Sequence, residues 1–67
     1  MSNWEILRAD GKYLGRSMAA GPATAFCDCM ITFGLVLNES EVTTEWLQDG
    51  SYRIMCRDEV YRLTASP

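Results

Sequence analysis

The chain has 67 residues, a net charge of −3 and 48% hydrophobic residues, enough for one small domain spanning residues 1–67. The hydrophobic content excludes an intrinsically disordered chain. The net negative charge disfavours direct nucleic-acid binding, because phosphate contacts need a basic face, and it suits a protein that binds a basic surface.

The first predicted element is a hairpin whose turn is Asp10-Gly11. This dipeptide favours a two-residue type I′ turn, in which both central residues have positive φ. The register of such a turn places Glu5 opposite Arg16, an ion pair across the strands, and Leu7 opposite Leu14. The two strands are expected at residues 4–8 and 12–16.

A helix is predicted at residues 22–37. Pro22 suits the first helical position, because its missing N–H would have had no helical partner. Gly34 would lie inside this helix as a weak point that lets a strand approach, and Asn38 would cap its C-terminus. The apolar face repeats at helical spacing. Its members are Phe26, Met30, Phe33 and Leu37.

The remaining chain predicts three strands, at residues 43–48, 51–57 and 60–64, joined by turns at Asp49-Gly50 and Asp58-Glu59. A two-residue turn at Asp49-Gly50 would assign the two faces of this sheet. The inward face would carry Leu47, Tyr52, Ile54, Cys56, Tyr61 and Leu63. The outward face would carry Trp46, Arg53, Met55, Arg57 and Arg62. The order ββαβββ predicts an α+β domain with one helix packed on an antiparallel sheet.

Cys27, Cys29 and Cys56 are interpreted as core residues. Cys27 and Cys29 diverge by about 200° on a helix, so they cannot both bind one ion. Zinc sites use paired Cys or His spacings, and the chain has no histidine. We expect three buried, reduced thiols and no metal or cofactor, with a metal or redox role as the alternative.

Catalytic and targeting signals are not found in the sequence. Without histidine the commonest general base is missing, and no Gly-rich loop precedes the helix. We therefore expect no catalytic residues and no enzyme activity. The N-terminal residues lack the basic and apolar segments of a signal peptide, and the apolar run at residues 30–37 is too short to span a membrane. A cytoplasmic, monomeric protein without membrane contact is expected.

The carboxylates concentrate in the C-terminal half, and five of them are predicted at one end of the sheet. They are Glu39, Glu41, Glu45, Asp58 and Glu59. One interpretation is solubility. The other is a surface that imitates a row of phosphates and occupies the nucleic-acid site of a basic protein partner.

A second candidate surface is the outward sheet face with Trp46, Arg53, Arg57 and Arg62. The predicted register sets Trp46 opposite Arg53, a geometry suited to cation–π contact, and Trp and Arg often anchor interfaces. Such a face would serve a regulatory or nucleic-acid-binding module. Alternatively, the arginine stems only cover the apolar side chains beside them.

The whole pattern resembles the phage-encoded anti-CRISPR proteins. The resemblance lies in a very short, acidic, histidine-free chain with one helix on a small antiparallel sheet, and no motif carries it. It implies binding to a subunit of a CRISPR surveillance complex, for example one of Cascade type, in the cytoplasm of the host cell. The five carboxylates would then replace DNA phosphates and block target DNA.

Overall fold

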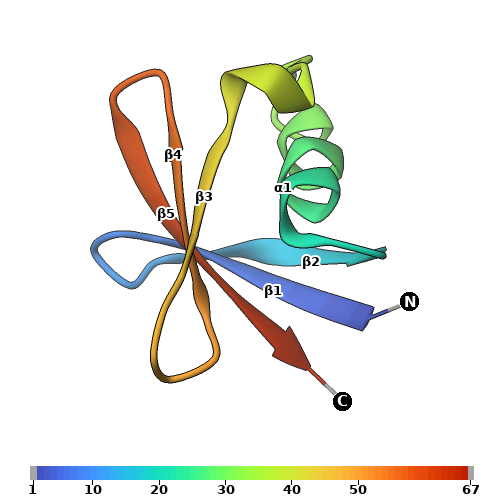
Figure 1. Cartoon of the computed structure of the whole chain (residues 1–67). Helices are drawn as coiled ribbons and strands as arrows, with labels where there is room; N and C mark the ends of the chain where they lie inside the picture. The colour runs from blue at the N-terminus through green and yellow to red at the C-terminus, as the bar shows by residue number, and fades with distance from the viewer. Residues whose placement is uncertain (1, 67) are drawn as a thin grey trace.

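The computed structural model describes residues 2–66 and has the predicted α+β class, with one α-helix on a five-stranded antiparallel sheet (Figure 1). The strands are β1 (Ser2–Arg8), β2 (Tyr13–Ala19), β3 (Thr43–Trp46), β4 (Tyr52–Cys56) and β5 (Glu59–Ser66). The helix α1 (Pro22–Ile31) follows β2, and a 3₁₀ turn, η1 (Glu39–Glu41), precedes β3. The order ββαβββ is confirmed.

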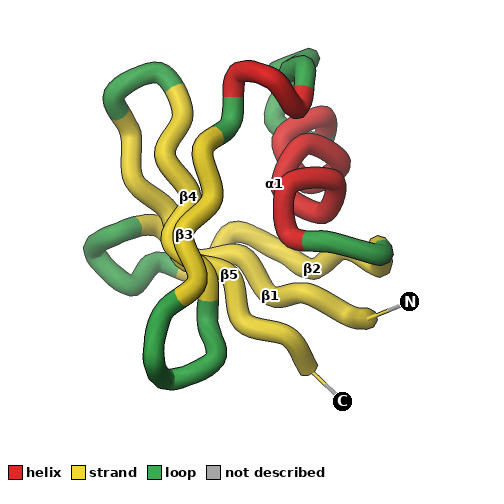
Figure 2. The backbone as a smooth tube through the Cα atoms, viewed as in Figure 1, coloured by secondary structure: helices red, strands yellow, loops and turns green. Residues whose placement is uncertain are grey.

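The sheet curls around the helix. Its strand order is β2-β1-β5-β4-β3, so β2 and β3 are opposite edges, yet α1 contacts both of them as well as β1. In Figure 2 the helix stands between β3 and β2, while the strands twist past one another. The inner face of the sheet is therefore covered by α1, and the outer face is left open.

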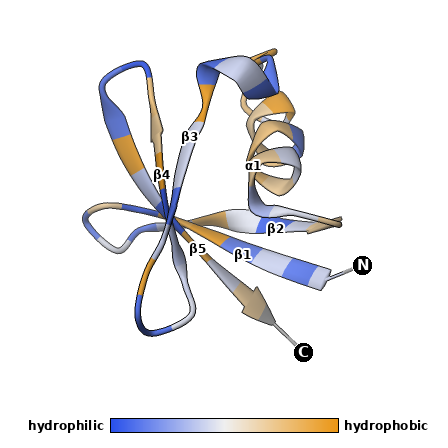
Figure 3. Ribbon diagram, viewed as in Figure 1, coloured by the Kyte–Doolittle hydropathy of each residue, from blue (hydrophilic) through white to orange (hydrophobic). Residues whose placement is uncertain are grey.

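The core fills the space between α1 and the inner face of the sheet. Ile6, Ile54 and Leu63 from three neighbouring strands have no exposed surface, and Phe26 of α1 packs among the same cluster. The buried indole of Trp4 donates a hydrogen bond of 3.1 Å to the carbonyl of Ala19, which ties β1 to the end of β2. Figure 3 shows the complementary pattern, with hydrophilic residues gathered at the hairpin tips.

Both Asp-Gly turns form, but each is a three-residue loop instead of the predicted two-residue turn. In the first, the Arg8 N–H donates to Lys12 O at 2.8 Å, and Gly11 takes the left-handed conformation with φ +92°. In the second, the Leu47 N–H donates to Ser51 O at 2.8 Å. A glycine that closes such a loop forms a G1 bulge and shifts the strand pairing by one residue.

The extra loop residue changes the register of both hairpins. Glu5 still lies opposite Arg16, as predicted, because a second irregularity between Ile6 and Leu7 restores the pairing. Leu7, however, pairs with Tyr13 and not with Leu14.

The helix ends at Ile31, six residues before the predicted end. Gly34 has φ +82°, its N–H donates to Ile31 O at 2.9 Å, and the Leu35 N–H donates to Met30 O at 3.1 Å. These two bonds form a Schellman motif, the usual glycine-terminated helix end. Gly34 thus stops the helix, and no strand approaches it, because a Cβ added at this position would meet nothing within 4 Å. It is Gly15 that lies close to α1, 3.4 Å from the Cys29 Sγ as measured from an added Cβ.

Candidate protein-interaction surfaces

The structure divides the five predicted acidic residues between two faces. Glu45 lies opposite Arg53 on the outer sheet face, and their side chains form an ion pair of 2.7 Å. Its inclusion in the predicted acidic end was wrong, because the three-residue loop shifts β3 by one position. The other four belong to η1 (Glu39 and Glu41), the β4–β5 turn (Asp58) and the start of β5 (Glu59), and all are exposed.

A fifth carboxylate, Asp28, joins this group from α1. The pKa of the Cys27 thiol is raised first by burial and then by the charges of Glu39, Cys56, Asp28 and Glu41. Glu39, Glu41 and Asp28 therefore act on the same thiol, Asp28 as its direct neighbour along α1. The sequence reasoning placed Asp28 only on the polar side of the helix, because it did not foresee that η1 folds back beside α1. The Thr24 hydroxyl shows this contact directly, donating to the Glu39 carboxylate at 3.1 Å.

Glu41 joins η1 to the β4–β5 turn. One of its oxygens accepts the Asn38 N–H at 3.0 Å, and the other accepts the Arg57 guanidinium at 3.1 Å. The Asn38 N–H, and secondarily Arg57, hold the pKa of the Glu41 carboxyl below its usual value. Asn38, predicted as the C-cap of the long helix, instead precedes η1. Glu41 is therefore engaged within the fold, although it remains exposed.

The β4–β5 turn has Arg57 and Asp58 at its centre, with φ values of +49° and +66°. Two successive positive φ angles define a type I′ hairpin turn. The predicted turn, Asp58-Glu59, was wrong by one residue, since Glu59 already belongs to β5 and pairs with Cys56. Arg57 is likewise not on the outer sheet face, because it turns to Glu41.

These residues define the acidic surface: Asp28, Glu39, Glu41, Asp58 and Glu59. The five carboxylates and Arg57, which pairs with Glu41, sum to a charge of −5 + 1 = −4. Two further cations, Arg8 and Lys12, line a pocket with Glu59 at the margin of this surface. The sum of −4 exceeds the net charge of −3 for the whole chain. The rest of the molecule is consequently close to neutral, and the charge is concentrated at one end.

Trp46 and Arg53 do not form the predicted shared face. Trp46 lies opposite Tyr52 and Glu45 lies opposite Arg53, so Trp46 points to the helix side of the sheet and Arg53 to the outer side. Leu47 is correspondingly displaced from the predicted core face. Of the six residues predicted for that face, the other five are confirmed by their packing in or against the core. Trp46 remains 64% exposed at the end of edge strand β3.

The outer sheet face combines arginines with exposed apolar side chains. The residues that define it are Glu5, Leu7, Tyr13, Arg16, Met18, Glu45, Arg53, Met55, Val60 and Arg62. Arg53 lies directly opposite Arg62, but each is paired, Arg53 with Glu45 and Arg62 with Asp49. Two hydrogen bonds from Ser51 are the main cause that lowers the pKa of the Asp49 carboxyl. The positive charge of this face is thus mostly compensated internally.

The three cysteines are buried and free, as the sequence predicted. Within residues 2–66 no cluster of three or more Cys, His, Asp or Glu side chains has a metal-binding arrangement. Burial raises the pKa of Cys29, as it does for Cys27, so both thiols favour the protonated form. Cys29 and Cys56 pack in the core cluster between helix and sheet, which matches the role of small core residues.

An exposed apolar segment begins at the last residue of α1 and continues beyond it, and sequence reasoning missed it. Ile31 is 58% exposed, Phe33 54% and Val36 82%, with Leu35 also exposed. Phe33 was predicted on the buried helix face, but the Schellman turn at Gly34 carries it away from the core. Glycine a few residues after a helical run is a known stop signal and was the available clue.

Comparison with protein-family models, curated protein sequences and solved structures finds no match to this chain. The assignment of function therefore depends on the surfaces described above. Over residues 2–66, no helix has the length and apolar character needed to cross a membrane.

Proposed function

We propose that this chain is a small inhibitory binding protein whose acidic surface docks on the basic nucleic-acid site of a protein partner and blocks it. The observation that carries the proposal is the summed charge of −4 on the acidic surface, whose carboxylates come from α1, η1, the β4–β5 turn and the start of β5. Such a surface presents anionic oxygens from separate segments on a folded support, as a nucleic-acid backbone presents phosphates. Complementary charge accelerates encounter and disfavours wrong partners.

The proposed class of partner is a nucleic-acid-handling protein, and a CRISPR surveillance complex is the candidate named by the resemblance to anti-CRISPR proteins. The contact residues in this proposal differ from those expected from sequence. Asp28 replaces Glu45, and Glu41 serves chiefly to hold η1 against Arg57. Asp28, Glu39, Asp58 and Glu59 then supply the charge offered to the partner.

A second candidate uses the outer sheet face, where Tyr13, Met18 and Met55 are each at least half exposed. Exposed aromatic and methionine side chains next to arginine are typical of interfaces. The internal pairing of Arg53 and Arg62 makes this face less suited to phosphate or acidic partners. It is the weaker candidate for that reason.

Two double variants with matched chemistry separate the candidates. Glu39→Lys with Glu59→Lys alters the acidic surface, while Glu5→Lys with Glu45→Lys alters the outer sheet face. Each pair changes the net charge from −3 to −3 + 4 = +1, so total charge is controlled. All four residues lie on the surface or at its margin, so both variants are expected to fold.

The proposal predicts that only the acidic-surface variant loses the partner in a pull-down with tagged chain and host extract. Binding of the unaltered chain should also weaken as salt is raised, because exposed charges are screened beyond about 10 Å at 0.1 M ionic strength. Loss of binding by the outer-face variant alone would replace the proposal with the second candidate.

A further inference from the structure

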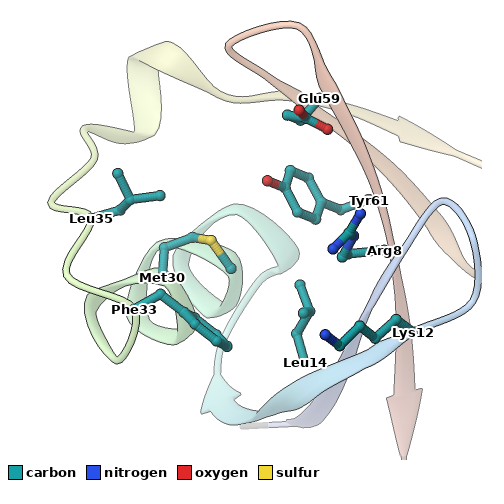
Figure 4. Close-up of a pocket in the computed structure, with 8 residues that line it drawn as sticks. All are labelled: Arg8, Lys12, Leu14, Met30, Phe33, Leu35, Glu59 and Tyr61. Atoms are coloured by element: carbon teal, nitrogen blue, oxygen red, sulfur yellow. The ribbon is translucent and has the colours of Figure 1, made fainter.

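A pocket of about 440 Å³ opens between the end of α1, the β1–β2 hairpin and the start of β5 (Figure 4). Its apolar wall comes from Leu14, Met30, Phe33 and Leu35. Small-molecule sites range from about 300 to 1,000 Å³ and are mostly apolar with a few oriented polar groups. The pocket has the size and composition of a site for a small ligand.

The polar groups of this pocket have a definite arrangement. In Figure 4 the nitrogen atoms of Arg8 and Lys12 lie on the hairpin side, and the apolar residues from the helix end lie across from them. Glu59 stands at the rim, beside Tyr61. Burial, and secondarily the charge of Glu59, raises the pKa of the Tyr61 hydroxyl, so the group stays a neutral hydrogen-bond donor.

The two cations are available to a ligand. Among residues 2–66 no ion pair involves Lys12. Arg8 approaches Asp10 at 3.7 Å, with both side chains at least half exposed, which is a weak contact. Because Glu59 offsets one of the two cations, the three charged side chains of the lining sum to +1, which suits a ligand with one anionic end and an apolar remainder.

Exposed apolar surface beside the pocket supports the same conclusion. Phe33 is 54% exposed and Leu35 39%, although both line the pocket wall. Covering them would remove apolar area from water, which favours binding. We propose that this pocket binds a small amphipathic carboxylate, with its anionic group between Arg8 and Lys12 and its hydrocarbon part against Phe33 and Leu35.

The pocket shares Glu59 with the acidic surface, but the proposal does not need the acidic surface to bind a partner and can be tested without one. The probe is sodium octanoate, added to isotopically labelled chain and followed by NMR. Octan-1-ol and octylammonium serve as controls with the same hydrocarbon length. A ligand of ten heavy atoms at ordinary efficiency should have a dissociation constant on the order of 1 mM.

The expected result is a saturable shift of the Leu14, Met30 and Leu35 methyl signals with octanoate. Octan-1-ol and octylammonium should bind about 2- to 5-fold more weakly than octanoate, since one exposed ion pair contributes a factor of that size. Lys12→Gln should weaken octanoate by a similar factor, whereas Arg16→Gln, which removes a cation from the outer sheet face, should not. Phe33→Ser should weaken all three probes.

Four outcomes would overturn the proposal, and the first three are read from the same titrations. The first is the absence of a saturable shift when the octanoate concentration reaches roughly ten times the expected dissociation constant. The second and third are equal affinity for octanoate and octan-1-ol, and signal shifts centred on the outer sheet face. The fourth is self-association of the chain through the exposed apolar segment, detected by sedimentation and abolished by Val36→Ser. It would contradict the proposal if octanoate did not compete with this self-association. The folded state of each variant is checked by circular dichroism.

Discussion

Substitution of Gly34 by alanine tests where the helix ends, because the two possible helix lengths predict stability changes of opposite sign. In the structure Gly34 has φ +82° and closes the Schellman motif. An alanine with left-handed φ costs roughly 1 kcal/mol relative to glycine. If the helix continued to residue 37, Gly34 would be an interior residue, and alanine would instead stabilise it by roughly 0.5–1 kcal/mol.

The assay is thermal unfolding followed by circular dichroism. For a domain of this size, 1 kcal/mol shifts the midpoint by roughly 4–8 °C. Gly34→Ala should lower the midpoint by about that amount, and Gly34→Asn should lower it less, since asparagine tolerates the left-handed region. A rise in the midpoint for Gly34→Ala would refute the Schellman end. It would also return Phe33 to the helix face and remove one wall of the proposed pocket.

Three further predictions concern stability and reactivity. Ile54→Ala should lower the free energy of unfolding in urea by about 2–5 kcal/mol, a large share of the roughly 3–10 kcal/mol expected for 67 residues. Val36→Ser, at a position 82% exposed, should change it by no more than about 0.5 kcal/mol, and equal effects of the two substitutions would contradict the assigned core. Because the folded-state pKa of Glu41 is lowered, its contribution to stability is present above the unfolded pKa and is lost as pH falls through the folded pKa. Glu41→Gln should therefore flatten the acid side of the stability profile, and an unchanged profile would argue against this contact. The buried Cys27 and Cys29, whose pKa values are raised, should react with a thiol reagent far more slowly in the folded than in the urea-unfolded chain, so fast labelling of the folded chain would be inconsistent with their packing.

The sequence was sufficient for the element order and most of the core. Alternation of apolar residues and two Asp-Gly dipeptides locate the hairpins, and residues such as Ile54 and Leu63 are then buried by the period of two. The sequence did not determine loop length, because Asp-Gly serves both two-residue and three-residue loops. That one-residue difference moved Trp46 to the helix side of the sheet and Glu45 to the outer face.

The acidic surface was predicted only in part, because one of its members depends on a tertiary contact. Glu39, Asp58 and Glu59 follow from their places in connectors near the same sheet end. Asp28 depends on how η1 packs beside α1, which is a tertiary contact that no local pattern encodes. The pocket was missed because Gly34 was interpreted as an interior helix residue, which placed Phe33 in the core.

The measurement that tests the central proposal most directly is partner capture by the two matched double variants at equal concentration and salt. The acidic-surface account predicts that Glu39→Lys with Glu59→Lys abolishes capture, while Glu5→Lys with Glu45→Lys, at the same net charge, retains it. Undiminished capture by the acidic-surface variant, at low and high salt alike, would contradict the account.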